Sequence, residues 1–291
     1  MSPSGVTEWD LPLEGFAVRV REIGRGEPIL CIHGGPGMSA GYFFPDPDVW
    51  GPGLRGLAAD HRVVAYDQRG CGGSGVPDVE QPLALSRHVD DLESVRSALG
   101  LERPIVLAHS FGSVLAILFA LRHPERVSRL IVLGGAPTRA FMDGYRQAVA
   151  AELPPDVQGK LAEIQSGEID DAAMRERFRL ALPLYFHRTL SDTERDSLLS
   201  VVSFSGRVNR AVAAGLEGYD LSSALPHVRA PSLVLYGASD RVVQPAYQLQ
   251  FRGRLPTARF VEFQESGHFP FLEEPEPFAR VVHYFAAHGG R

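Results

Sequence analysis

One serine stands where the chain could turn sharply from a strand into a helix. Ser110 is the middle residue of Ala108-His-Ser-Phe-Gly112, which follows the apolar segment Ile105–Ala108 and precedes an apolar helical segment. Small residues two positions before and after a serine let strand and helix pack closely and leave the hydroxyl exposed at the turn. The helix N-terminus also directs backbone N–H groups toward the reacting oxygen. This pattern predicts that Ser110 is a nucleophile.

A serine hydroxyl needs a general base, and the base needs a carboxylate that orients it. Asp240 lies in Gly237-Ala-Ser-Asp, just after a strand-like segment, and His268 lies in Ser266-Gly-His, just after the next one. The chain order serine, aspartate, histidine is the order that this kind of strand-to-helix turn requires. We therefore predict that Ser110, Asp240 and His268 form a catalytic triad.

The negative oxygen of a tetrahedral intermediate needs fixed hydrogen-bond donors. One expected donor is the backbone N–H of Phe111, next to the serine. The loop His33-Gly-Gly-Pro-Gly37 follows the first apolar strand, and its glycines allow the backbone to approach a substrate oxygen closely. We expect the N–H of Gly35 to be the second donor of this oxyanion hole.

Together these motifs resemble the proline iminopeptidase family of α/β-hydrolases. The resemblance rests on His33-Gly-Gly-Pro-Gly, on the serine turn, on the Asp240 and His268 loops, and on Asp67-Gln-Arg-Gly-Cys-Gly-Gly-Ser74. It covers roughly residues 20–136 and 226–285. It implies an α/β-hydrolase fold with a helical cap, a triad of the three residues named above, and release of an N-terminal residue, typically proline, from a peptide or amide.

The chain departs from this family at the serine turn and in the cap. Family members usually carry Gly-Gly-Ser-Trp-Gly, whereas this chain has Ala108-His-Ser-Phe-Gly112, which is closer to general esterases. The family also holds the free amine of its substrate with acidic residues, and Glu217 is the acidic candidate here, beside the basic Arg210 and Arg241. The predicted function is cleavage of amide bonds of N-terminal aminoacyl substrates through an acyl-enzyme. The alternatives are a carboxylesterase for hydrophobic acyl esters and a binding protein without turnover.

Aromatic side chains near these motifs are candidates for the substrate pocket. Two lie in the cap region and three follow the glycine loop; they are Tyr145, Tyr185, Phe43, Phe44 and Trp50. His109, beside the nucleophile, is expected to pack under the sheet. Asp67 and Arg69 are expected to form a buried pair that braces their loop.

The elements that must position these residues alternate between apolar strands and helices, which indicates a mostly parallel sheet covered by helices on both faces. The expected strands are Pro28–Ile32, Arg62–Tyr66, Ile105–Ala108, Arg129–Leu133, Ser232–Tyr236 and Arg259–Phe263. From about residue 137 to 225 the chain has only amphipathic helical segments. We therefore expect an α/β-hydrolase core of residues 1–136 and 226–291 and an inserted helical cap of residues 137–225.

Composition excludes several other classes of protein. The net charge is −6 without a basic run, so nucleic acid is not an expected partner. Only two cysteines and no histidine metal motif occur, and Lys160 is the only lysine, so we expect no metal, no cofactor and no disulfide framework. The absence of a signal peptide or a long apolar segment predicts a cytoplasmic protein that does not contact membranes. The expected partner is a small-molecule or short peptide substrate, and the oligomeric state is left open.

Overall fold

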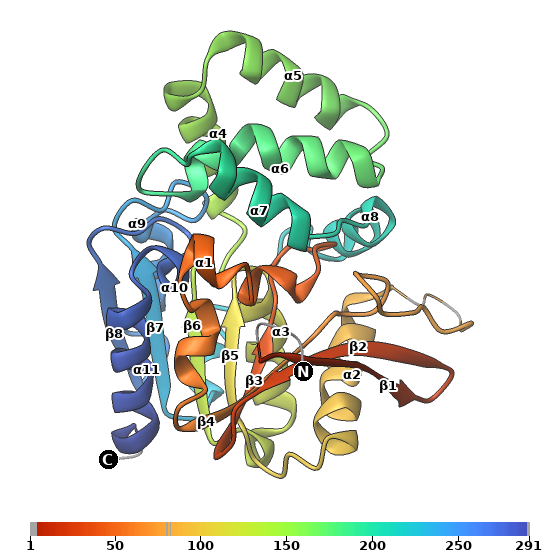
Figure 1. Cartoon of the computed structure of the whole chain (residues 1–291), viewed down its shortest axis with the longest axis vertical. Helices are drawn as coiled ribbons and strands as arrows, with labels where there is room; N and C mark the ends of the chain where they lie inside the picture. Colours follow the sequence, from red (N-terminus) through yellow and green to blue (C-terminus); the bar gives the residue numbers. More distant parts are fainter. Residues whose placement is uncertain (1–4, 80, 82, 290–291) are drawn as a thin grey trace.

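The apolar segments of the sequence form one eight-stranded sheet in the part of the chain that the structure describes (Figure 1). The structure is a computed structural model that describes residues 5–79, 81 and 83–289, so residues 1–4, 80, 82 and 290–291 of the expected core lie outside it. The strand order is β1-β2-β4-β3-β5-β6-β7-β8. The strands are β1 (Thr7–Leu13), β2 (Phe16–Ile23), β3 (Glu27–Ile32), β4 (His61–Tyr66), β5 (Ile105–His109), β6 (Arg129–Leu133), β7 (Ser232–Gly237) and β8 (Ala258–Phe263).

Strand β2 pairs antiparallel with both β1 and β4, and the remaining pairs are parallel. The expected α/β architecture is confirmed, and each of the six strands expected from the sequence lies within one residue of its observed bounds at either end. The hairpin of β1 and β2 was not expected. Apolar side chains such as Val18 and Val20, which are fully buried, alternate with charged ones in this hairpin. The hairpin therefore lacks the continuous apolar run by which the other strands were predicted.

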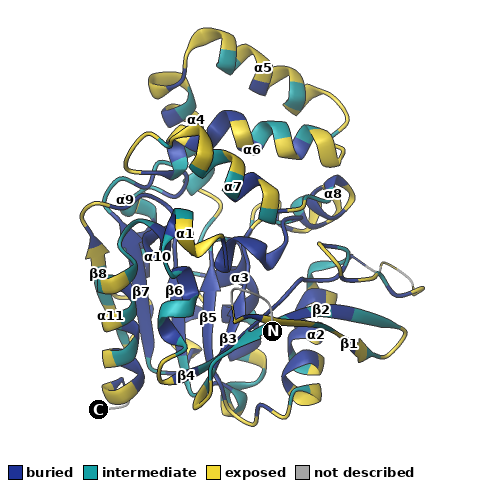
Figure 2. Ribbon diagram, in the orientation of Figure 1, coloured by how far each residue is buried: buried dark blue, intermediate teal, exposed yellow. Residues whose placement is uncertain are grey.

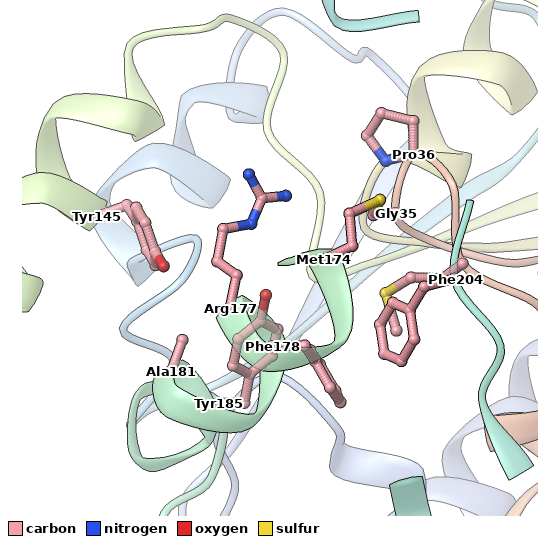
Figure 3. Close-up of a pocket in the computed structure, with 10 residues that line it drawn as sticks. Gly35, Pro36, Tyr145, Met174, Arg177, Phe178, Ala181, Tyr185 and Phe204 are labelled. Atoms are coloured by element: carbon pink, nitrogen blue, oxygen red, sulfur yellow. The ribbon is translucent and has the colours of Figure 1, made fainter. Parts of the chain in front are cut away.

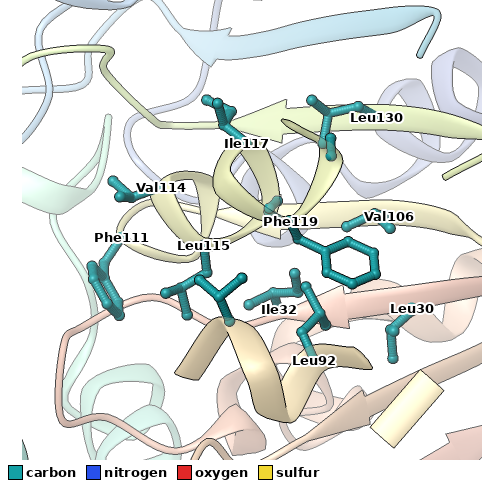
Figure 4. Packing of buried hydrophobic residues seen from close by; sticks show 14 of the residues in the cluster. Leu30, Ile32, Leu92, Val106, Phe111, Val114, Leu115, Ile117, Phe119 and Leu130 are labelled. Atoms are coloured by element: carbon teal, nitrogen blue, oxygen red, sulfur yellow. The ribbon is translucent and has the colours of Figure 1, made fainter. Parts of the chain in front are cut away.

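Alternation along the strands gives the sheet two apolar faces. In β3, Leu30 and Ile32 pack against helices α2 (Leu85–Ala98) and α3 (Gly112–Arg122), whereas Ile29 and Cys31 pack on the opposite face. Figure 4 shows the first cluster, where Leu92 of α2 and several α3 residues cover the strands. Burial on both faces explains why consecutive residues such as Ile29–Ile32 are apolar.

Helices cover both faces and the upper edge of the sheet (Figure 1). Their bounds are α1 (Pro47–Trp50), α2 (Leu85–Ala98), α3 (Gly112–Arg122), α4 (Phe141–Glu152), α5 (Pro155–Ser166), α6 (Asp171–Tyr185), α7 (Asp192–Val201), α8 (Gly206–Gly215), α9 (Pro245–Gln248), α10 (Pro270–Glu273) and α11 (Pro275–His288).

Helices α4 to α8 lie between β6 and β7 in the chain and form a cap above the sheet. The two ends of this segment lie side by side. The backbone N–H of Leu221 donates to the carbonyl of Pro137 at 2.9 Å, and Thr138 forms an isolated antiparallel β-bridge with Asp220. Figure 2 shows that α5 is largely exposed, whereas the other cap helices bury one side toward the sheet. The carboxyl ends of β3, β5, β6, β7 and β8 all point toward this cap, which is where ligands bind in open α/β sheets.

The Asp67–Arg69 pair expected from the sequence does not form. Asp67 instead accepts from the side chain of Arg21 at 2.8 Å and from the backbone N–H of Ala40 at 2.7 Å, while Arg69 pairs with Asp91. Asp67, Arg69 and Asp91 are buried and Arg21 is partly buried, and the two pairs brace the loop after β4. No helix of the described residues is long and apolar enough to cross a membrane.

Candidate active site

Ser110 lies at the sharp turn between β5 and α3. Its φ is +54°, a left-handed conformation that costs energy for a residue with a side chain, and its backbone N–H donates to the carbonyl of Leu133 at 2.8 Å. A Cβ on Gly112 would lie 2.5 Å from the carbonyl oxygen of Ile32, so only glycine fits where α3 crosses β3. The close packing inferred from the Ala-His-Ser-Phe-Gly spacing is thus present at Gly112, and Ala108 is fully buried.

Asp240 and His268 are joined by a buried hydrogen bond. His268 Nδ1 donates to Asp240 Oδ2 at 2.7 Å, and both side chains are at most 1% exposed. Asp240 Oδ1 accepts from the backbone N–H groups of Val242 and Val243 at 2.9 and 2.8 Å. Gln248 donates to Asp240 Oδ2 at 3.0 Å. The carboxylate is therefore fixed on all sides, and its bond to Nδ1 leaves Nε2 of His268 as the nitrogen that can accept a proton.

Gln248 was not predicted from the sequence, because it lies eight residues beyond Asp240 in the short helix α9 and belongs to no recognisable motif. Its amide also donates to the carbonyl of Val243 at 2.6 Å, so it holds the turn that carries the aspartate.

Ser110 and His268 both border Gly134, at the end of β6. A Cβ on Gly134 would lie 3.0 Å from His268 Cε1, and Ser110 is hydrogen-bonded to the residue before it. Ser110 Oγ and His268 form no hydrogen bond in the described part of the chain. Catalytic hydrogen bonds of ligand-free active sites are often long and shorten when substrate binds.

His109 connects three segments of the site through buried hydrogen bonds. Its Nε2 donates to the carbonyl of His268 at 2.9 Å, and its Nδ1 accepts from the hydroxyl of Tyr42 at 2.9 Å. The same hydroxyl accepts from the backbone N–H of Gly34 at 2.6 Å. Burial holds the pKa of His109 well below its ordinary value, so the ring is neutral and can serve as donor and acceptor at once. Tyr42 was not singled out in the sequence, and its role follows only from the folded chain.

The two expected oxyanion donors face the same cavity. Gly35 and Phe111 both line it, together with Ser110. Neither backbone N–H donates to an acceptor within the described residues, so both remain available to a substrate oxygen. A Cβ on Gly34 would lie 2.9 Å from Ser110 Cβ, which shows how closely this glycine loop approaches the serine.

The cap holds the glycine loop in place. Asn209 of α8 donates from its side chain to the carbonyl of Pro36 at 2.9 Å, and the backbone N–H of Ser205 donates to the carbonyl of Gly37 at 2.7 Å. The backbone N–H of Ser39 donates to the carbonyl of Ser203 at 3.1 Å, and the backbone N–H of Ser203 donates to the hydroxyl of Ser39 at 3.0 Å. We call residues 36–39 and 203–209 the loop–cap seam.

A second contact joins the cap to the histidine loop. Glu273 accepts from the backbone N–H of Gly267 at 2.7 Å and from that of His187, between α6 and α7, at 2.8 Å. Burial raises the pKa of Glu273 to about 7, against the opposing effect of these donors and of Arg188. This carboxyl group therefore titrates near neutral pH.

The cavity between cap and sheet has a volume of about 520 Å³, within the usual range for small-molecule sites. Of the residues expected from the sequence to bind substrate, it is lined by Tyr145, Tyr185, Arg210 and Glu217. Its apolar lining includes Val114, Phe141, Met142, Leu216, Val242 and Val243.

Phe43, Phe44 and Trp50 do not line this cavity, contrary to expectation. They are at most 7% exposed and belong to the apolar cluster below the cap. The chain after the glycine loop folds back onto the sheet in short helical turns, so these rings pack inward; Trp50, for example, lies against Phe186. Arg241 also lies outside the cavity lining, because it forms an ion pair with Glu152 at 2.9 Å.

Two cationic residues of the cavity were missed in the sequence. Arg177 of α6 and Arg139, which precedes α4, line it. Nothing local distinguishes them from the other arginines, and only the fold of the cap places them above Ser110.

This combination of fold and site defines a class of protein. The chain matches the α/β hydrolase fold family over residues 27–275 and therefore belongs to that family of hydrolases. The match agrees with the sheet order, the serine turn and the position of the cap described above.

Individual proteins within this family are also similar to the chain. The proline iminopeptidase of Heyndrickxia coagulans is 28% identical over 273 residues, which cover 90% of this chain and 91% of that protein. A 2-hydroxymuconate semialdehyde hydrolase of Pseudomonas putida is 30% identical over 285 residues, covering 94% and 92%. The crystal structure of proline iminopeptidase from Mycobacterium smegmatis matches with a TM-score of 0.72 at 23% identity, covering 97% of this chain and 98% of that one. The expected resemblance to the proline iminopeptidase family is confirmed.

Proposed function

We propose that this protein is a serine hydrolase that cleaves an amide or ester bond through an acyl-enzyme on Ser110. The observation that carries the proposal is the buried hydrogen bond between His268 Nδ1 and Asp240 Oδ2 beside the strained serine turn. An oriented imidazole with a free Nε2 and a serine that lines the same site are what nucleophilic catalysis requires.

In the proposed reaction, His268 Nε2 takes the hydroxyl proton as Ser110 Oγ bonds to the substrate carbonyl carbon. The carbonyl oxygen becomes negative and accepts from the N–H groups of Gly35 and Phe111. The C–N or C–O bond then breaks, and the proton on His268 passes to the leaving amine or alcohol. A water molecule attacks the acyl-enzyme in the same way and regenerates Ser110.

Within this chemistry, we propose aminopeptidase activity on N-terminal aminoacyl substrates as the first candidate. It is supported by the relatives named proline iminopeptidase and by Glu217, whose carboxylate is on the cavity wall and could pair with a substrate amine. The second candidate is a carboxylesterase, which is favoured by the apolar part of the lining formed by Val114, Phe141 and Val242.

The test compares kcat/KM on prolyl and alanyl anilides with kcat/KM on short acyl esters. Efficient anilide cleavage is the result expected of the aminopeptidase; negligible anilide cleavage beside rapid ester cleavage would replace it by the esterase. A fluorophosphonate probe should label the native protein and not Ser110→Ala. Equal labelling of both proteins would overturn the role of Ser110.

A further inference from the structure

The charged lining of the main cavity is mostly cationic. Among the described residues, its charged side chains are those of Arg139, Arg177, Arg210 and Glu217. Arg210 already has partners, since its guanidinium donates to the carbonyl of Ile169 and lies 3.9 Å from Glu168. Arg139 and Arg177 form no side-chain hydrogen bond or ion pair with any described residue. Both residues thus line the cavity without a bonded carboxylate, Arg177 half-buried and Arg139 exposed.

Arg177 stands out from its neighbours on α6. Arg175 donates to the carbonyl of Leu199 at 2.7 Å, and Arg179 forms an ion pair with Glu176. Both neighbours are exposed and outside the cavity, whereas Arg177 is half-buried and lines it. Arg175 and Arg179, which lie outside the cavity, therefore have protein partners, whereas Arg177, which lines the cavity, has no bonded partner among the described residues.

The position of Arg177 is close to the reacting groups. It borders both the main cavity and a small adjoining cavity of about 50 Å³, whose wall includes Gly35 and Pro36 of the glycine loop. Figure 3 shows its guanidinium extending between Tyr145 and this loop, above Tyr185. The ring of Tyr185 lies 5.5 Å from the ring of His268. Burial raises the pKa of Tyr185, and the nearby charge of Arg177 opposes this rise.

A half-buried guanidinium is a strong recognition group for a carboxylate, because its planar fork can donate two parallel hydrogen bonds. We propose that Arg177, with Arg139 as a second cation on the wall of the cavity, binds a carboxylate of the substrate. This inference rests on the proposed serine hydrolase function and adds the substrate class: an ester or amide that carries a free carboxylate away from the bond that is cleaved.

The carboxylate could belong to the acyl part or to the leaving group, and two pairs of substrates separate these cases. For the acyl part, mono-4-nitrophenyl adipate is compared with methyl 4-nitrophenyl adipate, which has the same chain without the charge. For the leaving group, the dipeptide Pro-Ala is compared with Pro-Ala amide. Each pair is measured on the native protein, on Arg177→Gln and on Arg179→Gln, the matched control on the exposed side of α6.

We expect Arg177→Gln to lower kcat/KM for the charged member of one pair by 10- to 100-fold, about 1.4–2.7 kcal/mol of transition-state binding, and to change the neutral member less than twofold. The pair that responds identifies the part of the substrate that carries the carboxylate. Arg179→Gln should leave both ratios unchanged. An equal loss for charged and neutral members, or no loss for either, would overturn the proposal.

A binding experiment separates failure of this inference from failure of the proposed function. Adipate and Pro-Ala are titrated by calorimetry into Ser110→Ala, and into Ser110→Ala carrying Arg177→Gln. Binding of either probe that weakens at least tenfold in the double variant supports the carboxylate site even if the native protein cleaves none of the four substrates. Absence of binding to Ser110→Ala, or equal binding to both variants, counts against the site whether or not the enzyme is active.

Discussion

At the scale of single residues, the site depends on buried side chains that do not line the cavity. Tyr42 and His109 link the glycine loop, the serine turn and the backbone of His268 through three hydrogen bonds. All of these groups are buried, so no water molecule can replace a lost partner. Each hydrogen bond therefore fixes the position of one backbone segment. The relative positions of the glycine loop, Ser110 and His268 are therefore maintained by these buried bonds as well as by the contact between His268 and Asp240.

Tyr42→Phe should weaken both stability and turnover. The substitution leaves the N–H of Gly34 and Nδ1 of His109 buried without partners, which costs about 1–3 kcal/mol of unfolding free energy. We expect kcat to fall about tenfold with little change in KM, because the loop that carries the Gly35 donor loses its anchor. Urea denaturation and steady-state kinetics measure the two effects.

Tyr66→Phe is the matched control. The Tyr66 hydroxyl is also buried and has no hydrogen-bond partner among the described residues, so its removal should leave stability and kcat nearly unchanged. A Tyr42→Phe protein that behaves like Tyr66→Phe would contradict the proposed anchoring.

At the scale of elements, close approach between β3 and α3 positions Ser110. Gly112→Ala should prevent this packing, because the added methyl group would lie 2.5 Å from the carbonyl of Ile32 and 2.7 Å from that of His33. We expect a loss of at least about 2 kcal/mol of unfolding free energy and loss of fluorophosphonate labelling. Gly159→Ala, where an added Cβ meets nothing within 4 Å, is the control and should be neutral or slightly stabilising.

The contact between the cap and the histidine loop makes stability depend on pH. With its pKa raised to about 7, Glu273 keeps its proton in the folded protein up to neutral pH, whereas in the unfolded chain it loses it near 4.5. The folded state thus binds more protons between these values, so the free energy of unfolding falls as pH rises from about 4.5 to about 7.

Glu273→Gln removes this titration. We expect the stability of the native protein relative to the variant to decrease by about 1–3 kcal/mol over that pH window, as measured by urea denaturation at several pH values. The exposed Glu276→Gln serves as control. A difference between native protein and Glu273→Gln that stays constant from pH 4.5 to 7.5 would refute the assignment.

At the scale of the whole molecule, cap and core share their hydrophobic clusters. Val208 and Val212 of α8 pack with the α2–α3 face, while Phe178 of α6 and Leu198 of α7 pack with the opposite cluster. We therefore expect the protein to unfold in one cooperative transition, with equal calorimetric and van't Hoff enthalpies. Two separate transitions would contradict this expectation.

A substitution in the cap tests the same coupling. Both tryptophans, Trp9 and Trp50, lie outside the inserted segment. Leu198→Ala removes a fully buried side chain from α7 and should cost about 2–5 kcal/mol. Tryptophan fluorescence and far-ultraviolet circular dichroism should report the same lowered midpoint. An unchanged fluorescence midpoint would show that cap and core unfold independently.

The sequence predicted those parts of the molecule whose requirements are local. The strands around β5 are apolar because they are covered on both faces, and the neighbours of Ser110 must be small because α3 crosses β3 there. The pocket walls follow different rules. Phe43 and Trp50 are as apolar as any pocket residue, and only the path of the chain after the glycine loop buries them in the core instead. No local feature of the sequence distinguishes Arg177 from the other arginines, and only the fold of the cap places it at the cavity.

The loop–cap seam has a consequence for engineering and for divergence of related enzymes. Asn209 and Ser205 support Pro36 and Gly37, next to the Gly35 donor, from the same segment that forms part of the roof of the pocket. Replacing the cap of this protein by the cap of another hydrolase, in order to change its selectivity, would also remove the hydrogen bonds that support the glycine loop. A chimera that keeps residues 203–209 should retain its rate with a simple acetate ester, whereas one that replaces them should be slow with every substrate.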